Sequence, residues 1–153
     1  MIQMGWPTRR WWKECVAYQI YPRSFNDSSG DGIGDLPGII QKLDYLKTLG
    51  VDLLWLNPIY ASPDVDNGYD ISDYQAVHPR FGAMTDVEHL IAETHARGMR
   101  IIMDLVLNHT AREHRWAQGW LAGDPAYAGF YTAFPDRTMP DAYDATIPEV
   151  FPD

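Results

Sequence analysis

The sequence predicts an α/β fold in which short buried strands alternate with amphipathic helices along a parallel sheet. Residues 51–56 and 100–107 are almost continuously apolar, as strands covered on both faces are. Apolar residues at helical spacing lie between these two segments, and a second set lies between the first of them and an earlier strand. A polar pair, Asn108-His109, follows the later strand at the end where ligands bind in such folds.

Each of the first elements is supported by its own residues. Residues 16–21 are β-branched and aromatic and predict the first strand, and residues 26–35 are rich in Asp, Ser and Gly and predict a loop. A helix is expected over 36–49, with Asp35 as its cap and Gly50 after its end. The apolar face of this helix is formed by Leu36, Ile39, Ile40, Leu43, Leu46 and Leu49.

The later elements continue the alternation. After the strand at 51–56, a polar loop is predicted over 61–83, and a second helix is expected to begin at Thr85 with Glu88 completing a capping box. The strand from residue 100 carries Asp104 in its apolar run, and a buried carboxylate requires a partner. Beyond His109 we expect a short helix within 113–122 and then an irregular but aromatic-rich segment over 123–153.

Composition excludes several classes of function. The net charge is −9, from 21 acidic and 12 basic residues, which argues against nucleic acid and, more weakly, against anionic membrane surfaces. No apolar run approaches the ~20 residues of a membrane span, and Met1 to Trp12 do not resemble a signal peptide. Cys15 is the only cysteine, so a cytoplasmic location is expected. The aromatic content of 13% suits either sugar stacking or core filling.

The Asp/Gly-rich loop has two interpretations. Its oxygen-bearing side chains alternate along the chain, and glycines between them permit tight turns, a pattern that favours a hard cation such as Ca²⁺. The alternative is a solvated turn that caps the following helix. Residues 64–74 also have two interpretations: four carboxylates and two tyrosines can recognise a sugar, or they form a polar surface loop around Asn67-Gly68. His109 is either a structural residue or a functional one.

Four motifs, in order along the chain, resemble glycoside hydrolase family 13, the α-amylase superfamily. They are Tyr18–Phe25, the Asp/Gly loop, Asn67–Asp70 and Asp104–Thr110. They are most similar to the α-glucosidase and oligo-1,6-glucosidase branch, whereas Phe134–Asp141 looks more like amylosucrase-type members. The resemblance implies that residues 1–110 provide strands one to three of a (β/α)8 (TIM) barrel and that residues 111–153 begin domain B.

The resemblance also implies roles for particular residues. Asp66 would hold sugar hydroxyls, Tyr69 would stack on the glucose ring, and His109 would hydrogen-bond a hydroxyl near the reacting carbon. Asp104 would be structural. The family's calcium loop would use Asp27, Ser29, Asp31, Asp35 and the carbonyl of Ile33, with Ser29 replacing the usual Asn or Asp. No organic cofactor is implied.

The implied reaction needs groups that this sequence does not match. Retaining hydrolysis uses two carboxyls about 5–5.5 Å apart, and the family supplies them after strands four and five. None of those motifs is present, so no catalytic residue is assigned and the chain alone is expected to be inactive. The leading hypothesis is the N-terminal part of a retaining α-glucoside hydrolase or transglucosylase acting on sucrose, maltose or isomalto-oligosaccharides. The alternative is a non-catalytic relative that serves as a binding or scaffold module.

Overall fold

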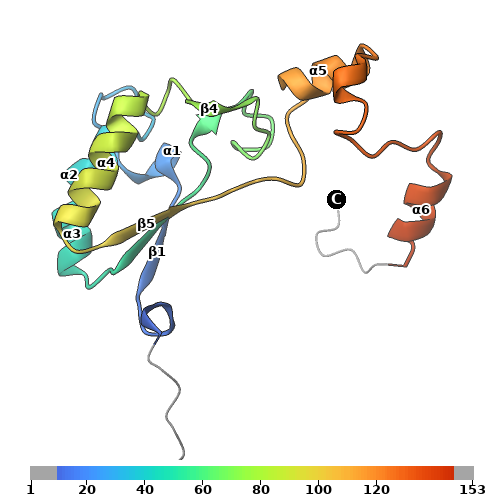
Figure 1. Ribbon diagram of the computed structural model, residues 1–153. Coiled ribbons are helices and arrows are strands. Elements are labelled where there is room, and N and C mark those ends of the chain that lie inside the picture. Colours follow the sequence, from blue (N-terminus) through green and yellow to red (C-terminus); the bar gives the residue numbers. More distant parts are fainter. Residues whose placement is uncertain (1–9, 147–153) are drawn as a thin grey trace, which may run out of the picture. The chain divides into compact units, whose positions relative to one another are not determined.

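The computed structural model describes residues 10–146, which fall into two compact units divided between His114 and Arg115. We call them the sheet unit, residues 10–114, and the C-terminal unit, residues 115–146. Figure 1 shows the helices α2, α3 and α4 packed along one side of the strands of the sheet unit. This is the strand–helix alternation that the sequence predicts.

The sheet unit is built on three parallel strands. They are β1 (Ala17–Ile20), β2 (Leu53–Leu56) and β5 (Arg100–Met103), in the order β1-β2-β5. The strands pair in register, so that Gln19, Trp55 and Ile102 form one row across the sheet. The next row toward the carboxyl ends contains Ile20, Leu56 and Met103. All three strands therefore end at the same edge of the sheet, and the polar residues Asn57 and Asp104 directly follow β2 and β5 there.

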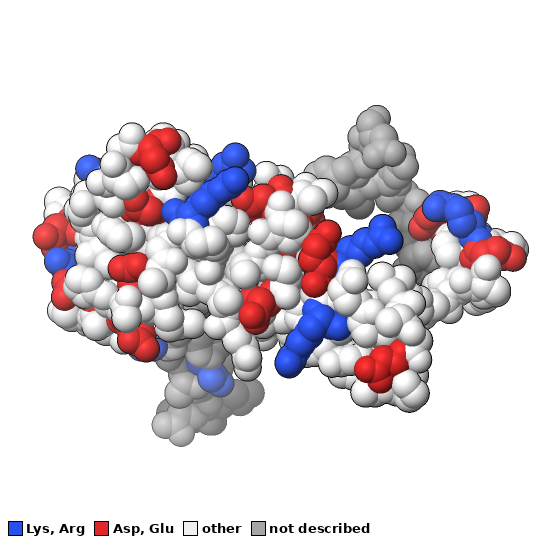
Figure 2. Space-filling view, turned by 90° about the horizontal axis from the view of Figure 1, so that it is seen from above, with Lys and Arg blue, Asp and Glu red and all other residues white. Residues whose placement is uncertain are grey.

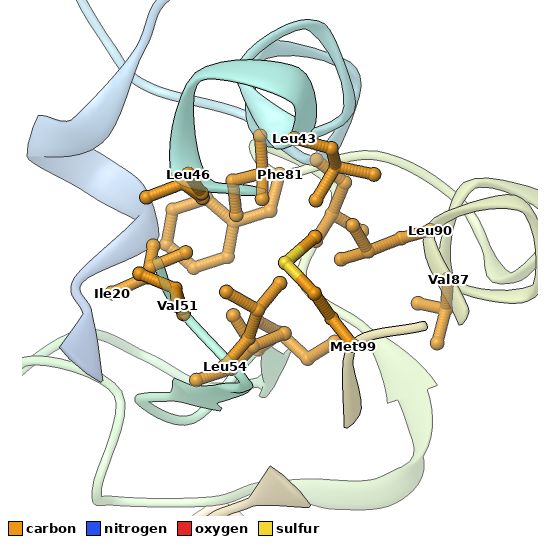
Figure 3. Packing of buried hydrophobic residues seen from close by; sticks show 13 residues of the cluster. Ile20, Leu43, Leu46, Val51, Leu54, Phe81, Val87, Leu90 and Met99 are labelled. Atoms are coloured by element: carbon orange, nitrogen blue, oxygen red, sulfur yellow. The ribbon is translucent and has the colours of Figure 1, made fainter. Parts of the chain in front are cut away.

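Helices cover one face of this sheet and enclose the core. They are α1 (Pro22–Phe25), α2 (Leu36–Gln41), α3 (Leu43–Thr48) and α4 (Met84–Ala96), with the short 3₁₀ turn η1 (Trp11–Lys13) ahead of β1. Figure 3 shows apolar side chains of α3 and α4, among them Leu43, Leu46 and Leu90, gathered with Ile20 and Leu54 of the strands. Fully buried members of this core are Ile20, Leu36, Ile39, Leu43, Leu46, Leu54, Leu56 and Leu90.

The opposite face of the sheet is open, which corrects the expectation of strands buried on both sides. Trp55 is 37% exposed and Ile102 is 47% exposed. The strand at residue 100 is also shorter than predicted: it ends at Met103, and Leu105 and Leu107 are exposed. Apolar composition alone indicates that a segment suits a buried environment, but the neighbouring strands determine whether both faces are covered.

The sequence pattern misplaced the extent of the first helix and the start of the second. The predicted helix over 36–49 is divided at Lys42 into α2 and α3. The expected capping box at Thr85 is wrong, because α4 begins one residue earlier, at Met84, with Ala83 as its N-cap. The Asp86 carboxylate accepts the Ala83 N–H at 2.7 Å, so only the return half of the box is made, since Ala has no side-chain acceptor.

The predicted polar loop over 61–83 contains regular structure. The antiparallel strands β3 (Tyr60–Ala61) and β4 (Asp73–Val77) pair across it, with a register shift between Tyr60 and Ala61. This ladder is continued by the His78 N–H, which donates to the Ile59 carbonyl at 2.8 Å. The hairpin therefore closes the segment 62–72 into a compact loop at the carboxyl edge of the sheet.

The C-terminal unit contains α5 (Arg115–Leu121), the 3₁₀ turn η2 (Pro125–Tyr127) and α6 (Thr138–Asp144). The short helix expected within 113–122 is confirmed as α5, whereas α6 was not predicted. Aromatic pairs hold α5 against the following segment: Trp116 lies 5.2 Å from Phe130 and Trp120 lies 5.9 Å from Tyr131, between ring centroids. Where domain B begins remains a prediction.

The surface charge follows the acidic composition. On the face seen in Figure 2, the Lys and Arg side chains among the described residues are interspersed with Asp and Glu and form no continuous basic band. Within the described part of the chain, no helix combines the length and apolar character required to cross a membrane.

Candidate functional site

The loop between β3 and β4 is organised around the carboxylate of Asp70. This carboxylate accepts hydrogen bonds from the Ser62 hydroxyl at 2.8 Å, the Val65 N–H at 2.9 Å and the Asp66 N–H at 3.1 Å. Burial acts to raise the pKa of Asp70, but these three donors outweigh burial and the pKa is lowered. The ionised Asp70 therefore fixes the backbone that precedes Tyr69.

Two further features shape the same loop. Asp64 and Asn67 have positive φ angles of 61° and 52°, and Gly68 has a φ of 93°. The Asp64 carboxylate lies 3.0 Å from the Arg80 guanidinium and 3.4 Å from Nε2 of His78, which anchors the strained backbone at Asp64 to the far side of the hairpin. The left-handed turn at Asn67-Gly68, a strong turn signal in the sequence, directs the chain into Tyr69.

Tyr69 is the centre of the polar cluster at the carboxyl edge of the sheet. Its hydroxyl donates to Oδ2 of Asp104 at 2.8 Å and accepts from Nδ2 of Asn57 at 3.1 Å. Burial, the hydrogen bond to Asp104 and the negative charges of Asp104 and Asp66 together raise the pKa of Tyr69 to about 12. The phenol therefore stays protonated at neutral pH and remains a donor.

His109 lies beside Tyr69. Its Nε2 is 3.2 Å from the carbonyl oxygen of Tyr69, and because a carbonyl only accepts, this contact requires the tautomer protonated at Nε2. The Tyr74 hydroxyl donates to the carbonyls of Val106 and His109, which fastens the segment after β5 to the hairpin. The Asp104 N–H still donates to the Leu56 carbonyl of β2 at 3.2 Å, and the chain beyond it is fastened by Tyr74.

The structure places the three predicted sugar-binding residues in one part of the sheet unit. Tyr69 and His109 share a hydrogen bond, and Asp66 belongs to the same loop as Tyr69, whose N–H donates to the Asp66 carbonyl at 2.9 Å. The side chains of Asp66 and His109 are exposed, whereas Tyr69 is half-buried. An exposed carboxylate and an imidazole beside an aromatic ring can hydrogen-bond sugar hydroxyls around a stacked ring.

Asp104 has the partners that its position in an apolar run required. Its Oδ1 accepts from Nε1 of Trp55 at 2.7 Å, and its Oδ2 accepts from Tyr69. Three residues that connect to it, directly or through Tyr69, were not identified as site residues from the sequence: Trp55, Asn57 and Gln19. A signal was present for Asn57, which follows the last residue of β2, but nothing distinguishes Gln19 from other polar strand residues.

The loop that resembles the family's calcium loop has suitable ligand types, but its carboxylates accept hydrogen bonds from the loop itself and from the start of α2. The Asp27 carboxylate accepts N–H groups of Ser29, Gly30 and Gly32, which lowers its pKa, and the Asp31 carboxylate accepts the Ile33 N–H at 2.8 Å. Asp35 accepts from Ser28 and from the Gly38 N–H as the cap of α2. Within residues 10–146, no group of three or more His, Cys, Asp or Glu side chains is arranged to hold a metal ion.

The parallel strand–helix order and the polar cluster at the carboxyl ends of the strands define the sheet unit as an α/β fold with its site at the strand ends. Comparison with known proteins gives the family. Residues 19–150 match the family described as alpha amylase, catalytic domain. The chain therefore belongs to the α-amylase family, and its sheet unit forms the first three strands of the (β/α)8 barrel.

Two curated relatives show how similar this chain is to known proteins. The chain is 59% identical over 129 residues to an oligo-1,6-glucosidase of Halalkalibacterium halodurans, covering 84% of this chain and 23% of that protein. It is 60% identical over 121 residues to a palatinase of Erwinia rhapontici, covering 78% and 22% of the two proteins. The chain thus spans about a quarter of the length of these curated relatives.

Solved structures give the same result for the fold. The trehalulose synthase MutB from Pseudomonas mesoacidophila aligns with a TM-score of 0.80 at 52% identity, over 82% of this chain and 23% of that one. The isomaltulose synthase SmuA from Protaminobacter rubrum aligns with a TM-score of 0.80 at 50% identity, over the same shares. A mutant of MutB is known in complex with the substrate sucrose.

Proposed function

We propose that this chain is part of a retaining α-glucoside hydrolase or transglucosylase and holds the non-reducing glucose of its substrate. The observation that carries the proposal is the joining of Tyr69 to His109 at the carboxyl edge of the sheet, with Asp66 in the same loop. Asp66 would bind hydroxyls, Tyr69 would stack on the ring, and the imidazole of His109 would bind a hydroxyl near the reacting carbon.

The proposed substrates are small α-glucosides such as sucrose, maltose and isomalto-oligosaccharides. The relatives support this class, because they include an oligo-1,6-glucosidase, a palatinase and a structure bound to sucrose. We place the enzyme in the cytoplasm, with which a single cysteine, Cys15, is compatible.

Asp104 is not proposed as the nucleophile or the acid/base. Each of its oxygens accepts a hydrogen bond, from Trp55 or from Tyr69, which fits the structural role that the resemblance implies. Asp66 is assigned to substrate binding, and Glu149 lies outside the described residues. A retaining mechanism needs a second carboxyl about 5–5.5 Å from the nucleophile. We therefore assign no catalytic carboxyl within this chain and expect no turnover from it alone.

A segment exchange tests the substrate-binding roles. The matching segment of the Halalkalibacterium halodurans oligo-1,6-glucosidase is replaced by this chain, and kcat/KM is measured on an aryl α-glucoside. We expect activity in the hybrid and a loss on the order of 100-fold for Asp66→Asn, Tyr69→Ala or His109→Ala, because a mispositioned substrate reacts slowly. Asp44→Asn, at an exposed carboxylate 2.7 Å from Arg97, is the matched control.

Two outcomes would contradict the proposal. One is full activity of the hybrid when all three binding residues are substituted. The other is clear turnover of aryl α-glucosides by the purified 153-residue chain, which would mean that its own carboxylates perform the chemistry.

We further propose that the Asp/Gly loop binds Ca²⁺ through Asp27, Ser29, Asp31, Asp35 and the Ile33 carbonyl, which requires some carboxylates to exchange N–H groups for the ion. The support is the set of oxygen ligands, which hard cations prefer. We expect Ca²⁺ to raise the unfolding temperature, and Asp31→Asn to remove this effect. Asp73→Asn is matched to it, because Oδ1 of each residue accepts the N–H two residues ahead at 2.8 Å. An unfolding temperature independent of Ca²⁺ would refute the site.

A further inference from the structure

A chain of hydrogen bonds crosses the carboxyl edge of the sheet and ends on Asp104. Nε2 of Gln19 donates to Oδ1 of Asn57 at 2.8 Å, and Nδ2 of Asn57 donates to the Tyr69 hydroxyl at 3.1 Å. The Tyr69 hydroxyl donates to Oδ2 of Asp104 at 2.8 Å, while Nε1 of Trp55 donates to Oδ1 at 2.7 Å. Residues from β1, β2, the hairpin loop and the segment after β5 are thereby connected.

Each link in this chain has only one possible direction. An ionised carboxylate only accepts, so the proton of the Tyr69 hydroxyl must be directed at Asp104. The Tyr69 oxygen is then an acceptor, and Asn57 must present its NH₂ group to it. The carbonyl oxygen of Asn57 is left facing Gln19, which donates its own NH₂. Reversal of the Asn57 amide would place an acceptor against the lone pairs of the Tyr69 oxygen.

We propose that Gln19 and Asn57 are positioning residues that fix the orientation of the Tyr69 hydroxyl and, through it, the ring that faces the sugar. The proposal rests on the sugar-binding role proposed above for Tyr69. Gln19 acts through Asn57: it fixes the direction of the amide, which then supplies the second anchor of the phenol. With Asp104 alone, the hydroxyl would have one anchor and the ring could pivot about it.

The location of Gln19 separates this role from a contribution to the core. Gln19 is exposed and lies in the row with Trp55 and Ile102, on the sheet face that carries no helices. The backbone link between β1 and the end of β2, from the Asn57 N–H to the Ile20 carbonyl at 3.0 Å, does not involve the Gln19 side chain. Substitution of Gln19 therefore changes the hydrogen-bond chain and leaves the buried core intact.

The test uses Gln19→Glu in the full 153-residue chain, read by NMR at the Cζ carbon of Tyr69 and the side-chain amide of Asn57. At pH 7 the introduced carboxylate only accepts, so we expect the Asn57 amide to reverse and both resonances to move. Acidification to about pH 4, where Glu becomes protonated, restores a donor at this position and returns both resonances toward the native values. Tyr69→Phe and Asn57→Asp assign the two signals.

Controls isolate the effect. Gln75→Glu places the same charge at another exposed glutamine in a strand, outside the hydrogen-bond chain. The ionisable groups facing Tyr69 are Asp104, Asp66, Tyr21 and His109, and they are present in the native chain and in both variants, so their own titration is subtracted. Equal unfolding midpoints for both variants exclude a general loss of structure.

Identical Tyr69 and Asn57 resonances in Gln19→Glu and Gln75→Glu at pH 7 would overturn the proposal. A displacement confined to Gln19→Glu, and reversed by acid, supports it. The segment exchange reports separately on sugar binding, since a hybrid whose activity is insensitive to Tyr69→Ala refutes the sugar role while this NMR result stands.

Discussion

The proton on Tyr69 is held more tightly in the folded chain than in the unfolded chain. Burial and the Asp104 carboxylate raise the pKa to about 12, against an ordinary value of about 10. A raised pKa contributes stability that is fully present below the ordinary value and is lost as pH rises through the folded value. We therefore expect the free energy of unfolding to fall between about pH 10 and 12, as measured by urea denaturation.

Tyr69→Phe provides the comparison for this pH dependence. Without the phenol of residue 69, the free energy of unfolding should fall less over the same pH interval. Any fall that remains comes from the other tyrosines, which are present in both proteins. An equal slope in the native chain and in Tyr69→Phe would show that Tyr69 does not have the raised pKa.

Thr94 carries a buried hydroxyl without a hydrogen-bond partner. The residue is fully buried in α4, and its Oγ1 is the one buried side-chain polar atom among the described residues that makes no hydrogen bond. Thr94→Val exchanges the hydroxyl for a methyl group of similar size, so we expect stabilisation by about 1 kcal/mol in urea denaturation.

Thr48→Val is the control for this substitution. The Thr48 hydroxyl is exposed and donates to the Asp44 carbonyl at 2.9 Å, so its replacement should change the free energy of unfolding by no more than ~0.5 kcal/mol. Destabilisation by Thr94→Val would indicate that the hydroxyl finds a partner in solution.

The candidate site could be predicted only in part at this scale. Asp66, Tyr69 and His109 were placed by motif, and the need of Asp104 for a partner followed from the cost of a buried charge. The identity of its partners did not follow, because Trp55 and Tyr69 lie far from Asp104 in the sequence and reach it only through the sheet register and the hairpin loop. Gln19 gave no signal that distinguishes a linking residue from an exposed strand residue.

The junction between the Asp/Gly loop and α2 leaves no room for a side chain. The Asp35 N–H donates to the Asn26 carbonyl at 3.1 Å, and a Cβ atom on Gly38 would overlap this carbonyl oxygen. We expect Gly38→Ala to destabilise the chain by about 1–3 kcal/mol, as over-packed sites do. Gly129→Ala is the control, because a Cβ there meets nothing within 4 Å. Equal unfolding midpoints for the two variants would contradict the close packing.

Strands and helices were predicted well where an apolar pattern extended over several consecutive residues and was bounded by turn residues. The strands β1, β2 and β5 and the helix α4 are confirmed, because apolar period and turn residues determine them within a few positions. The hairpin of β3 and β4 was missed, since its strands are short and polar and their pairing depends on residues that surround Asp70. The division of the first long helix at Lys42 also left no local signal, because its apolar spacing continues across the break.

At the scale of the whole molecule, the uncovered sheet face predicts self-association of the 153-residue chain. Trp55 and Ile102 lie in one exposed row, and β1 and β5 each have an edge without a partner among the described strands. We expect concentration-dependent sedimentation and a broad thermal transition. Ile102→Lys should reduce association, because it places a charge within the row.

Val65→Lys is the control for association, since Val65 is 85% exposed but lies in the loop before Tyr69 and outside the row. A monomer with a sharp, cooperative thermal transition would contradict the expectation.

The parallel register of the sheet also determines how this chain must fold. Ala17 pairs with Leu53, and Leu53 pairs with Arg100, so the two ladders join residues that are 36 and 47 positions apart in the sequence. Two long loops must close before the sheet gains its hydrogen bonds, and such non-local pairing slows folding. On a ribosome, β1 must wait for β2 to emerge, and β2 must then wait for β5. During that interval the apolar residues of β2 are exposed to chaperones and to neighbouring nascent chains.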